Sequence, residues 1–157
     1  MIEGLHVDIN EEVELLSHVP MFAKLDKNKL RLLAFTSEAL CYRDKEIIFH
    51  QSESPDGAYV VMSGEVEVVS HTSAGEVVNA VRGKNALIGE MAVITNQPRS
   101  ATIRAKGPVQ MLKISSDLFL KLLTENPDVA LDVMRQLSRK IAEAQHQYEI
   151  LQVQLLQ

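Results

Sequence analysis

The sequence predicts a mainly β fold with flanking helices: an antiparallel β jelly-roll or barrel with N-terminal helices, a short inserted helix and a long C-terminal helix. The middle of the chain holds short segments rich in Val and Ile between turn signals, and helical spacing of apolar residues precedes and follows them. The chain has 157 residues, 46% of them hydrophobic, which suits one domain with a packed core. We therefore expect one domain with helices over 1–40, the barrel over 41–115 and helices over 116–157.

Two short helices are expected near the N-terminus. Residues 11–16 form an amphipathic turn or two that stops near Pro20. Asp26 is a suitable N-cap for a second helix, and Leu25 and Leu30 have the spacing of a hydrophobic staple around that cap.

The barrel strands are predicted from partly alternating, β-branched segments separated by Gly, Pro, Asn and Ser. They are Glu46–Phe49, Ala58–Ser63, Glu65–Ser70, Glu76–Val81, Ser100–Ala105 and Val109–Ile114. A small sheet of this kind closes or folds over to cover its edges.

The helical period returns after the last strand. Ser115 or Ser116 suits an N-cap, and Asn126 followed by Pro127 signals the start of another helix that meets no Gly or Pro afterwards. Its apolar residues alternate steps of four and three, as in a coiled-coil seam, at Ala130, Met134, Leu137, Ile141, Ala144, Tyr148, Leu151 and Leu155. We expect the part near Met134 and Leu137 to pack on the barrel and residues 134–155 to form a parallel homodimer.

Composition excludes several classes of protein. Sixteen basic and 21 acidic residues give a net charge of −5, which argues against a broad nucleic-acid surface, and we expect no DNA binding by this chain alone. One cysteine, Cys41, and five isolated histidines leave no disulfide framework or metal cluster, and no nucleophile–base set indicates an enzyme. Without a membrane-length apolar run or a signal-like N-terminus, a cytoplasmic protein is expected.

Residues 88–102 interrupt the strand pattern and bring polar groups together. Gly89 opens a short helix that ends at residues 96–98, and Arg99, Ser100 and Thr102 follow at once. Amides at a helix start, a guanidinium and a hydroxyl are donors for a phosphate, whereas Glu90 suits a sugar hydroxyl at the rim. Arg82 and Lys84 are interpreted as solvated turn residues.

This segment resembles the phosphate-binding cassette of cyclic nucleotide-binding domains, a superfamily that includes catabolite-activator-type regulators and the regulatory subunits of cAMP-dependent kinase. The resemblance extends from about Leu15 to about Lys140 and includes residues 46–51 and 56–66. It implies that Arg99 pairs with the cyclic phosphate and that Glu90 accepts the ribose 2′-hydroxyl. The remaining ligand-binding residues that it implies are Gly89, Met91, Ala92, Ser100, Ala101 and Thr102.

The chain departs from the family pattern at several positions. Family members often have glycine where Lys45, Ser52 and Asn85 stand. Where catabolite-activator-type regulators place Thr and Ser against the purine, this chain has Ala144 and Gln145, and Tyr148 is a further candidate for capping the base. These departures concern the choice of purine. The resemblance itself implies a cyclic nucleotide ligand, with cAMP favoured over cGMP, and no other cofactor.

The sequence leaves two functions open. The first is a cyclic nucleotide sensor that couples occupancy to rearrangement of the C-terminal helix and acts through a downstream protein partner that the sequence does not identify. Transcriptional relatives continue into a helix-turn-helix domain, so this chain is either a fragment or a stand-alone sensor. The alternative is a dimeric interaction or scaffold protein that does not bind nucleotide.

Overall fold

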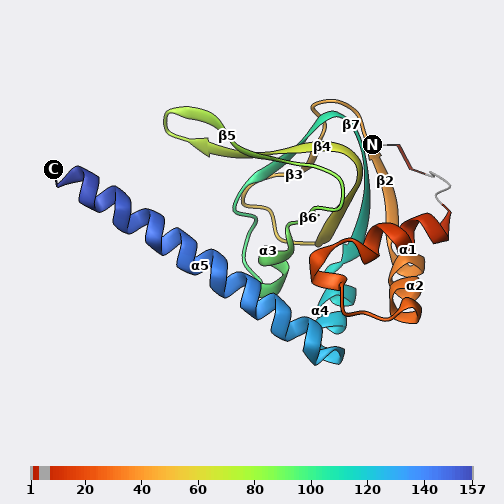
Figure 1. The fold of residues 1–157 in the computed structure, drawn as a ribbon. Coiled ribbons are helices and arrows are strands. Elements are labelled where there is room, and N and C mark those ends of the chain that lie inside the picture. The colour runs from red at the N-terminus through yellow and green to blue at the C-terminus, as the bar shows by residue number, and fades with distance from the viewer. Residues whose placement is uncertain (1, 4–7, 157) are drawn as a thin grey trace.

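The computed structural model describes residues 2–3 and 8–156 and confirms the predicted fold class (Figure 1). An antiparallel sheet folds over on itself, and helices cover one end of it. The strands are β1 (Ile2–Glu3), β2 (Glu38–Tyr42), β3 (Ile47–Phe49), β4 (Gly57–Thr72), β5 (Gly75–Arg82), β6 (Leu87–Ile88) and β7 (Thr102–Ser115). The helices are α1 (Ile9–Ser17), the 3₁₀ turn η1 (Pro20–Phe22), α2 (Lys27–Thr36), α3 (Glu90–Thr95), α4 (Ser116–Glu125) and α5 (Pro127–Leu155).

The two long strands β4 and β7 form the centre of the sheet. The order is β1-β2-β7-β4-β5, with β3 paired to β7 and β6 paired to β4, all antiparallel. Each long strand was expected as two strands separated by a turn, and that expectation is wrong. The register shifts on both sides of Ser63, next to Gly64 with φ of 83°, so Ser63-Gly64 bends a continuous strand instead of ending it.

The N-terminal segment contains strand as well as helix. β1 pairs with β2, which begins at Glu38, so the region expected to be helical ends in strand. The Asp26 cap is confirmed, since its side chain accepts a hydrogen bond from the Lys29 amide at 2.8 Å. Ser115, and not Ser116, caps α4 by accepting from the Leu118 amide.

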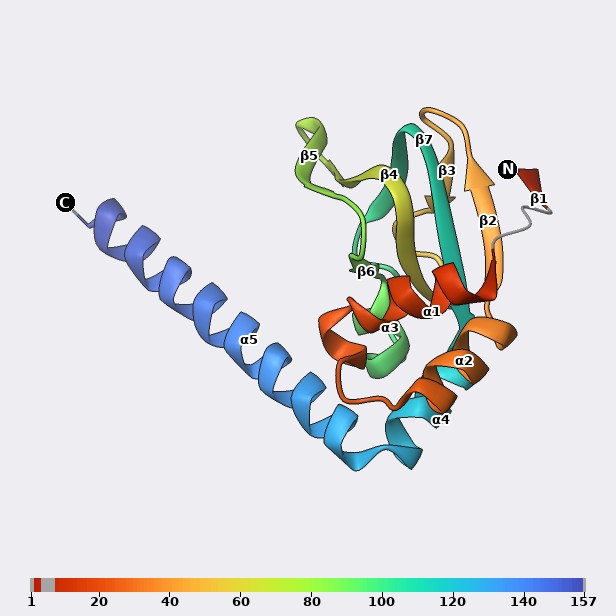
Figure 2. The ribbon, with the colours of Figure 1, turned by 45° about the vertical axis from the view of Figure 1, so that its right-hand side comes forward.

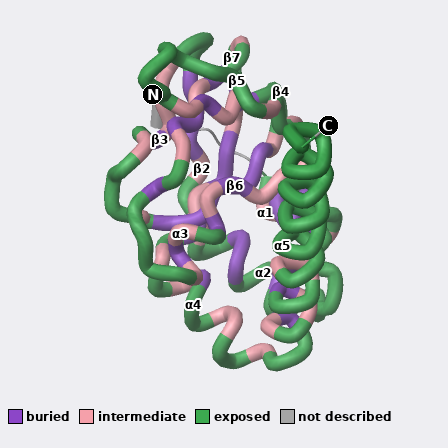
Figure 3. The backbone as a smooth tube through the Cα atoms, turned by 90° about the vertical axis from the view of Figure 1, so that its left-hand side faces the viewer, coloured by how far each residue is buried: buried purple, intermediate pink, exposed green. Residues whose placement is uncertain are grey.

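The buried hydrophobic residues form two cores. Figure 3 shows that the buried backbone is concentrated in the body of the protein and not in the distal part of α5. One lies between the helices and the sheet and includes Phe22, Leu112 and Phe119. The other fills the interior of the folded sheet and includes Phe49 and Tyr59. The segment from β6 to α3 contributes to both cores, which places residues 88–102 between them.

The helix α5 begins on the body of the protein and then projects away from it (Figures 1 and 2). Asn126 and Pro127 mark its start as predicted, although the Asn126 side chain bonds to Leu122 and Lys29 instead of capping α5. Val129 and Val133 are buried and Leu137 is partly buried, whereas Met134 is 57% exposed. The expected packing of this part of the helix is therefore confirmed at Leu137 and wrong at Met134. Residues 138–156 are exposed throughout.

Candidate functional site

The site is built around Gly89, which joins β6 to α3. Gly89 has φ of 79° and ψ of 10°, a left-handed conformation that side chains other than glycine rarely adopt. A Cβ at this position would lie 3.1 Å from the Phe49 ring and would collide with the Arg99 guanidinium. Both backbone conformation and space therefore require glycine here.

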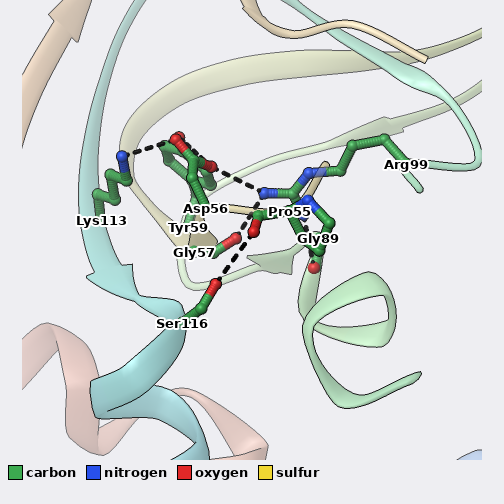
Figure 4. A network of polar contacts seen from close by, with 8 residues as sticks. All are labelled: Pro55, Asp56, Gly57, Tyr59, Gly89, Arg99, Lys113 and Ser116. Atoms are coloured by element: carbon green, nitrogen blue, oxygen red, sulfur yellow. Dashed lines mark hydrogen bonds and ion pairs between the residues drawn. The ribbon is translucent and has the colours of Figure 1, made fainter. Parts of the chain in front are cut away.

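The Arg99 side chain is buried and is held by three acceptors (Figure 4). Its residue exposure is 3%. Nη1 donates to the Gly89 carbonyl at 2.7 Å, and Nη2 donates to the Gly57 carbonyl at 2.6 Å and to Asp56 Oδ1 at 3.1 Å. The guanidinium carbon lies 3.9 Å from the centroid of the Phe49 ring, a favourable cation–π contact. The buried Nε has no hydrogen-bond partner among the described residues, so the guanidinium is not fully satisfied by the protein.

Asp56 connects Arg99 to a second cation and to a tyrosine (Figure 4). Lys113 Nζ donates to Asp56 Oδ2 at 2.7 Å, and the Tyr59 hydroxyl donates to the same carboxylate at 3.3 Å. Burial acts to raise the pKa of Asp56, but the hydrogen bond and charge of Lys113 and the charge of Arg99 outweigh it and lower that pKa. Burial raises the pKa of Tyr59, and Asp56 adds to that effect. Asp56 is therefore the anion, and Tyr59 the neutral donor, of this network.

A cavity of about 220 Å³ opens beside Arg99 and α3. Apart from the predicted cassette residues, its lining residues are Phe49, Val68, Arg82, Leu87, Ile88, Ile103 and Lys140. Glu90 is buried, and its Oε1 lies 3.7 Å from Lys140 Nζ. Because Lys140 belongs to α5, this ion pair connects the cavity wall to the projecting helix.

The structure brings most of the predicted ligand residues together. Gly89, Glu90, Met91, Ala92, Arg99, Ser100 and Ala101 all line the cavity. Thr102 does not, since its hydroxyl accepts a hydrogen bond from the Gln51 amide at 2.8 Å. The candidate base-capping residues Ala144, Gln145 and Tyr148 lie on the exposed part of α5 and do not line the cavity in this conformation.

Several residues of the site were not singled out from the sequence. Phe49, Asp56 and Lys140 come from segments distant from the cassette, and no local spacing connects them to it. Arg82, interpreted as a solvated turn residue, is exposed at the end of β5 and also lines the cavity. The sequence signal that could have pointed to Lys140 is its position just before Ala144 and Gln145 on the same predicted helix.

The arrangement suits a small ligand with one negative charge and hydroxyl groups. Arg99 and the cations at the mouth, Arg82 and Lys140, supply positive charge, Ser100 supplies a hydroxyl, and Glu90 supplies an acceptor. Among the residues that the structure describes, no group of three His, Cys, Asp or Glu side chains is arranged to hold a metal ion. Within the same residues, no helix is both long and apolar enough to cross a bilayer.

The chain thus combines a folded-over antiparallel sheet, an inserted short helix and a buried arginine beside a cavity that suits a small anion. The family whose description is "Cyclic nucleotide-binding domain" matches residues 39–126. The chain belongs to the cyclic nucleotide-binding domain family.

Relatives with known structure or curated function support this assignment. The chain is 29% identical over 115 residues to a cAMP-dependent protein kinase regulatory subunit of Blastocladiella emersonii, covering 73% of this chain and 28% of that protein. It is 27% identical to the catabolite activator protein of Thermus thermophilus, with a TM-score of 0.76 over 84% of this chain and 62% of that one. The sensor domain of the transcriptional regulator DNR of Pseudomonas aeruginosa shares the fold at 24% identity, with a TM-score of 0.78 over 84% of this chain and 89% of that one.

The match to curated relatives is confined to one part of each. The chain spans 28% of the kinase regulatory subunit and 14% of a potassium channel of Oryza sativa subsp. japonica to which it is 27% identical over 122 residues, 77% of this chain. The family fold is therefore shared between proteins whose remaining parts differ.

Proposed function

We propose that this chain is a regulatory cyclic nucleotide sensor, with cAMP or cGMP as its ligand. The observation that carries the proposal is the Arg99 guanidinium, which is buried, lines the cavity and keeps an unpartnered Nε. The cyclic phosphate would bind at Arg99 and Ser100, with backbone donors from Gly89 and Ala101, and a ribose hydroxyl would donate to Glu90. A hydrogen bond to a charged group contributes about 1.5–3 kcal/mol, so losing the Arg99 contact should cost tenfold or more in affinity.

Lys140 supports the proposed coupling of occupancy to α5. It pairs with Glu90 at the cavity mouth, and it lies where the exposed part of α5 begins. A ribose hydroxyl that donates to Glu90 competes with Lys140 for the same carboxylate. Ligand binding would therefore weaken the ion pair between the cassette and α5, so that the helix takes up a new arrangement.

Calorimetric titration with cAMP and cGMP tests the proposal. Ser100→Ala removes an exposed donor without disturbing the core, and Arg99→Lys keeps the charge but not the planar fork. Both should weaken binding, whereas Arg43→Ala, an exposed arginine outside the cavity, should leave it unchanged. No binding of either nucleotide by folded wild-type protein would exclude the sensor function.

The alternative function is a dimeric scaffold that does not bind nucleotide. One observation favours it: both terminal nitrogens of Arg99 already donate to protein acceptors, so the cation has a structural role in holding Gly57 and Gly89 together. The titration separates the two functions, because a scaffold gives no heat with either nucleotide.

We also propose a homodimer through residues 134–155. The seam residues Ile141, Tyr148, Leu151 and Leu155 are exposed on a helix that leaves the body of its own protomer. A second copy of the same helix, in parallel, would cover them.

A further inference from the structure

A second cavity, of about 310 Å³, forms a groove between α2 and α4 on a part of the molecule distinct from the candidate nucleotide site. Its walls are largely leucine, and its rim carries two lysines. The lining residues are Lys29, Leu32, Leu33, Thr36, Leu118, Lys121, Leu122, Glu125 and Asn126. None of them lines the cavity beside Arg99.

Large apolar side chains extend the groove onto the surface of α2. Leu32 is 64% exposed, and Phe35, three residues further along the same helix, is 77% exposed. Residues three apart lie on the same helical face, so the two side chains form one apolar strip. With the leucines of α4, this strip is an exposed hydrophobic surface of the type that marks an interaction site.

The α2 wall of the groove is positively charged in a chain that is negative as a whole, whereas α4 carries both signs. α2 carries Lys27, Lys29 and Arg31 and no acidic residue, although the net charge of the chain is −5. Within the described part of the chain, no carboxylate lies within ion-pair distance of these three cations or of Lys121. Glu125 is the acidic residue among the lining residues. Lys29 Nζ donates to Asn126 Oδ1 at 2.6 Å, so the cations of this surface have no ion-pair partner among the described residues but Lys29 is hydrogen-bonded.

We propose that the groove between α2 and α4 binds an acidic amphipathic helix of a partner protein. Apolar side chains at helical spacing would insert between Leu32 and Leu122, and carboxylates on the flanks of that helix would meet Lys29 and Lys121. The concave shape favours a helix over a lipid surface, because a flat bilayer does not reach the walls of a groove. A partner bound here contacts Asn126, the residue from which α5 departs.

The probe is a fluorescent synthetic helix of about four turns, with Leu at positions i, i+3 and i+7 and Glu on the flanks, titrated into the intact chain without nucleotide. A peptide with the same composition in scrambled order is its control. The double variant Leu32→Ser, Phe35→Ser should lose at least tenfold in affinity, because the apolar anchors are gone. Lys29→Glu with Lys121→Glu should lose a similar factor, and it should abolish the salt dependence seen with wild-type protein.

Two matched variants control for composition and charge. Val78→Ser removes an exposed apolar side chain on β5, and Lys106→Glu reverses an exposed lysine on β7; both should bind the peptide as the wild type does. Equal affinity for the ordered and scrambled peptides, or for wild type and the Leu32 and Phe35 variant, overturns the proposal. It is also overturned if vesicles of phosphatidylcholine and phosphatidylserine bind and the peptide does not. A change of oligomeric mass in the Leu32 and Phe35 variant would assign the groove to a second copy and overturn the separate partner. Failure of nucleotide binding affects none of these readouts.

Discussion

Lys45 and Ser52 adopt left-handed backbone conformations that cost free energy in residues other than glycine. Their φ values are 68° and 75°. The resemblance to cyclic nucleotide-binding domains implies glycine at these positions, and the left-handed conformation supplies a physical reason for it. The left-handed conformation costs a residue with a Cβ about 1–2 kcal/mol, and glycine avoids this cost. Glycine in turn loses more conformational entropy on folding, which offsets about 0.5–1 kcal/mol of the gain. Lys45→Gly and Ser52→Gly should each stabilise the protein by about 0.5–1 kcal/mol, measured by urea denaturation.

The opposite substitution provides the control. Gly75 and Gly107 have φ of 113° and 74°, and a Cβ built on either would meet no atom within 4 Å. Gly107→Ala therefore tests conformation without steric contact, and a loss of about 1 kcal/mol is expected. Unchanged stability in the Lys45 and Ser52 variants would show that the left-handed backbone at those loops carries no strain.

Asp56 gives the protein a pH dependence that can be assigned to one carboxylate. Its pKa is lowered in the folded state, so its contribution to stability is present above the unfolded pKa of about 3.9 and is lost as the pH falls through the lower folded value. Asp56→Asn should lower the free energy of unfolding at about pH 7. Below about pH 4 the variant should lose less stability than the wild type, because it has no carboxylate at position 56 to become protonated. Denaturation at several pH values measures both effects.

The control for Asp56 is an exposed carboxylate outside the network. Glu65→Gln removes an exposed charge on β4 that has no ion pair among the described residues. This variant should lose stability at low pH to the same extent as the wild type. An identical acid dependence in the Asp56→Asn and Glu65→Gln variants would contradict the role of Asp56. The sequence did not reveal this network because Asp56 and Lys113 lie far from Arg99 along the chain.

The site residues that could be predicted from the sequence are those that lie close together along the chain. Gly89, Glu90, Arg99 and Ser100 fall within one segment, so a local motif was enough to find them, and the structure places all four around one cavity. Lys140 required knowledge of how α5 crosses the cassette. That crossing depends on tertiary packing, which no spacing in a single sequence reports.

At the scale of elements, capping signals predicted where helices begin. Asp26 and Ser115 have side chains that satisfy the first free amides of α2 and α4, and both are readable in the sequence. Strand lengths were less predictable, because Gly64 and Gly107 bend β4 and β7 without ending them. A bulge and a turn use the same residue types, and only strand pairing distinguishes them.

The exposed seam of α5 carries a prediction about assembly. Tyr148→Glu with Leu151→Glu places two charges in the proposed interface, and should convert a dimer into a monomer because buried like charges repel. Sedimentation equilibrium over a range of concentrations measures the mass.

The control places the same charge on the opposite face of α5. His146 is two residues from Tyr148 and outside the seam, so His146→Glu should leave the mass unchanged. A wild-type chain that remains monomeric at all concentrations would refute the dimer.

At the scale of the whole molecule, the cavity beside Arg99 and the projecting helix are connected by the ion pair of Glu90 and Lys140. Lys140 and Glu90 also line a cavity of about 210 Å³ on the side of η1, so the pair lies between two spaces. Since α5 beyond Lys140 is exposed, few contacts oppose its movement. The fold thus combines a well-packed sheet with a helix whose position depends on a small number of interactions.

This arrangement predicts that ligand binding changes the position of α5 and that Lys140 is required for the change. Spin labels at Lys106→Cys and His146→Cys, in a Cys41→Ser background, report the distance between β7 and α5 by pulsed electron resonance. Saturating cAMP should shift that distance, and Lys140→Met should give the shifted distance without ligand because the Glu90 ion pair is absent. Arg139→Met, an adjacent exposed cation that lines neither cavity, should behave as wild type. If calorimetry shows that cAMP binds and the distance distribution stays the same, occupancy is not transmitted through α5.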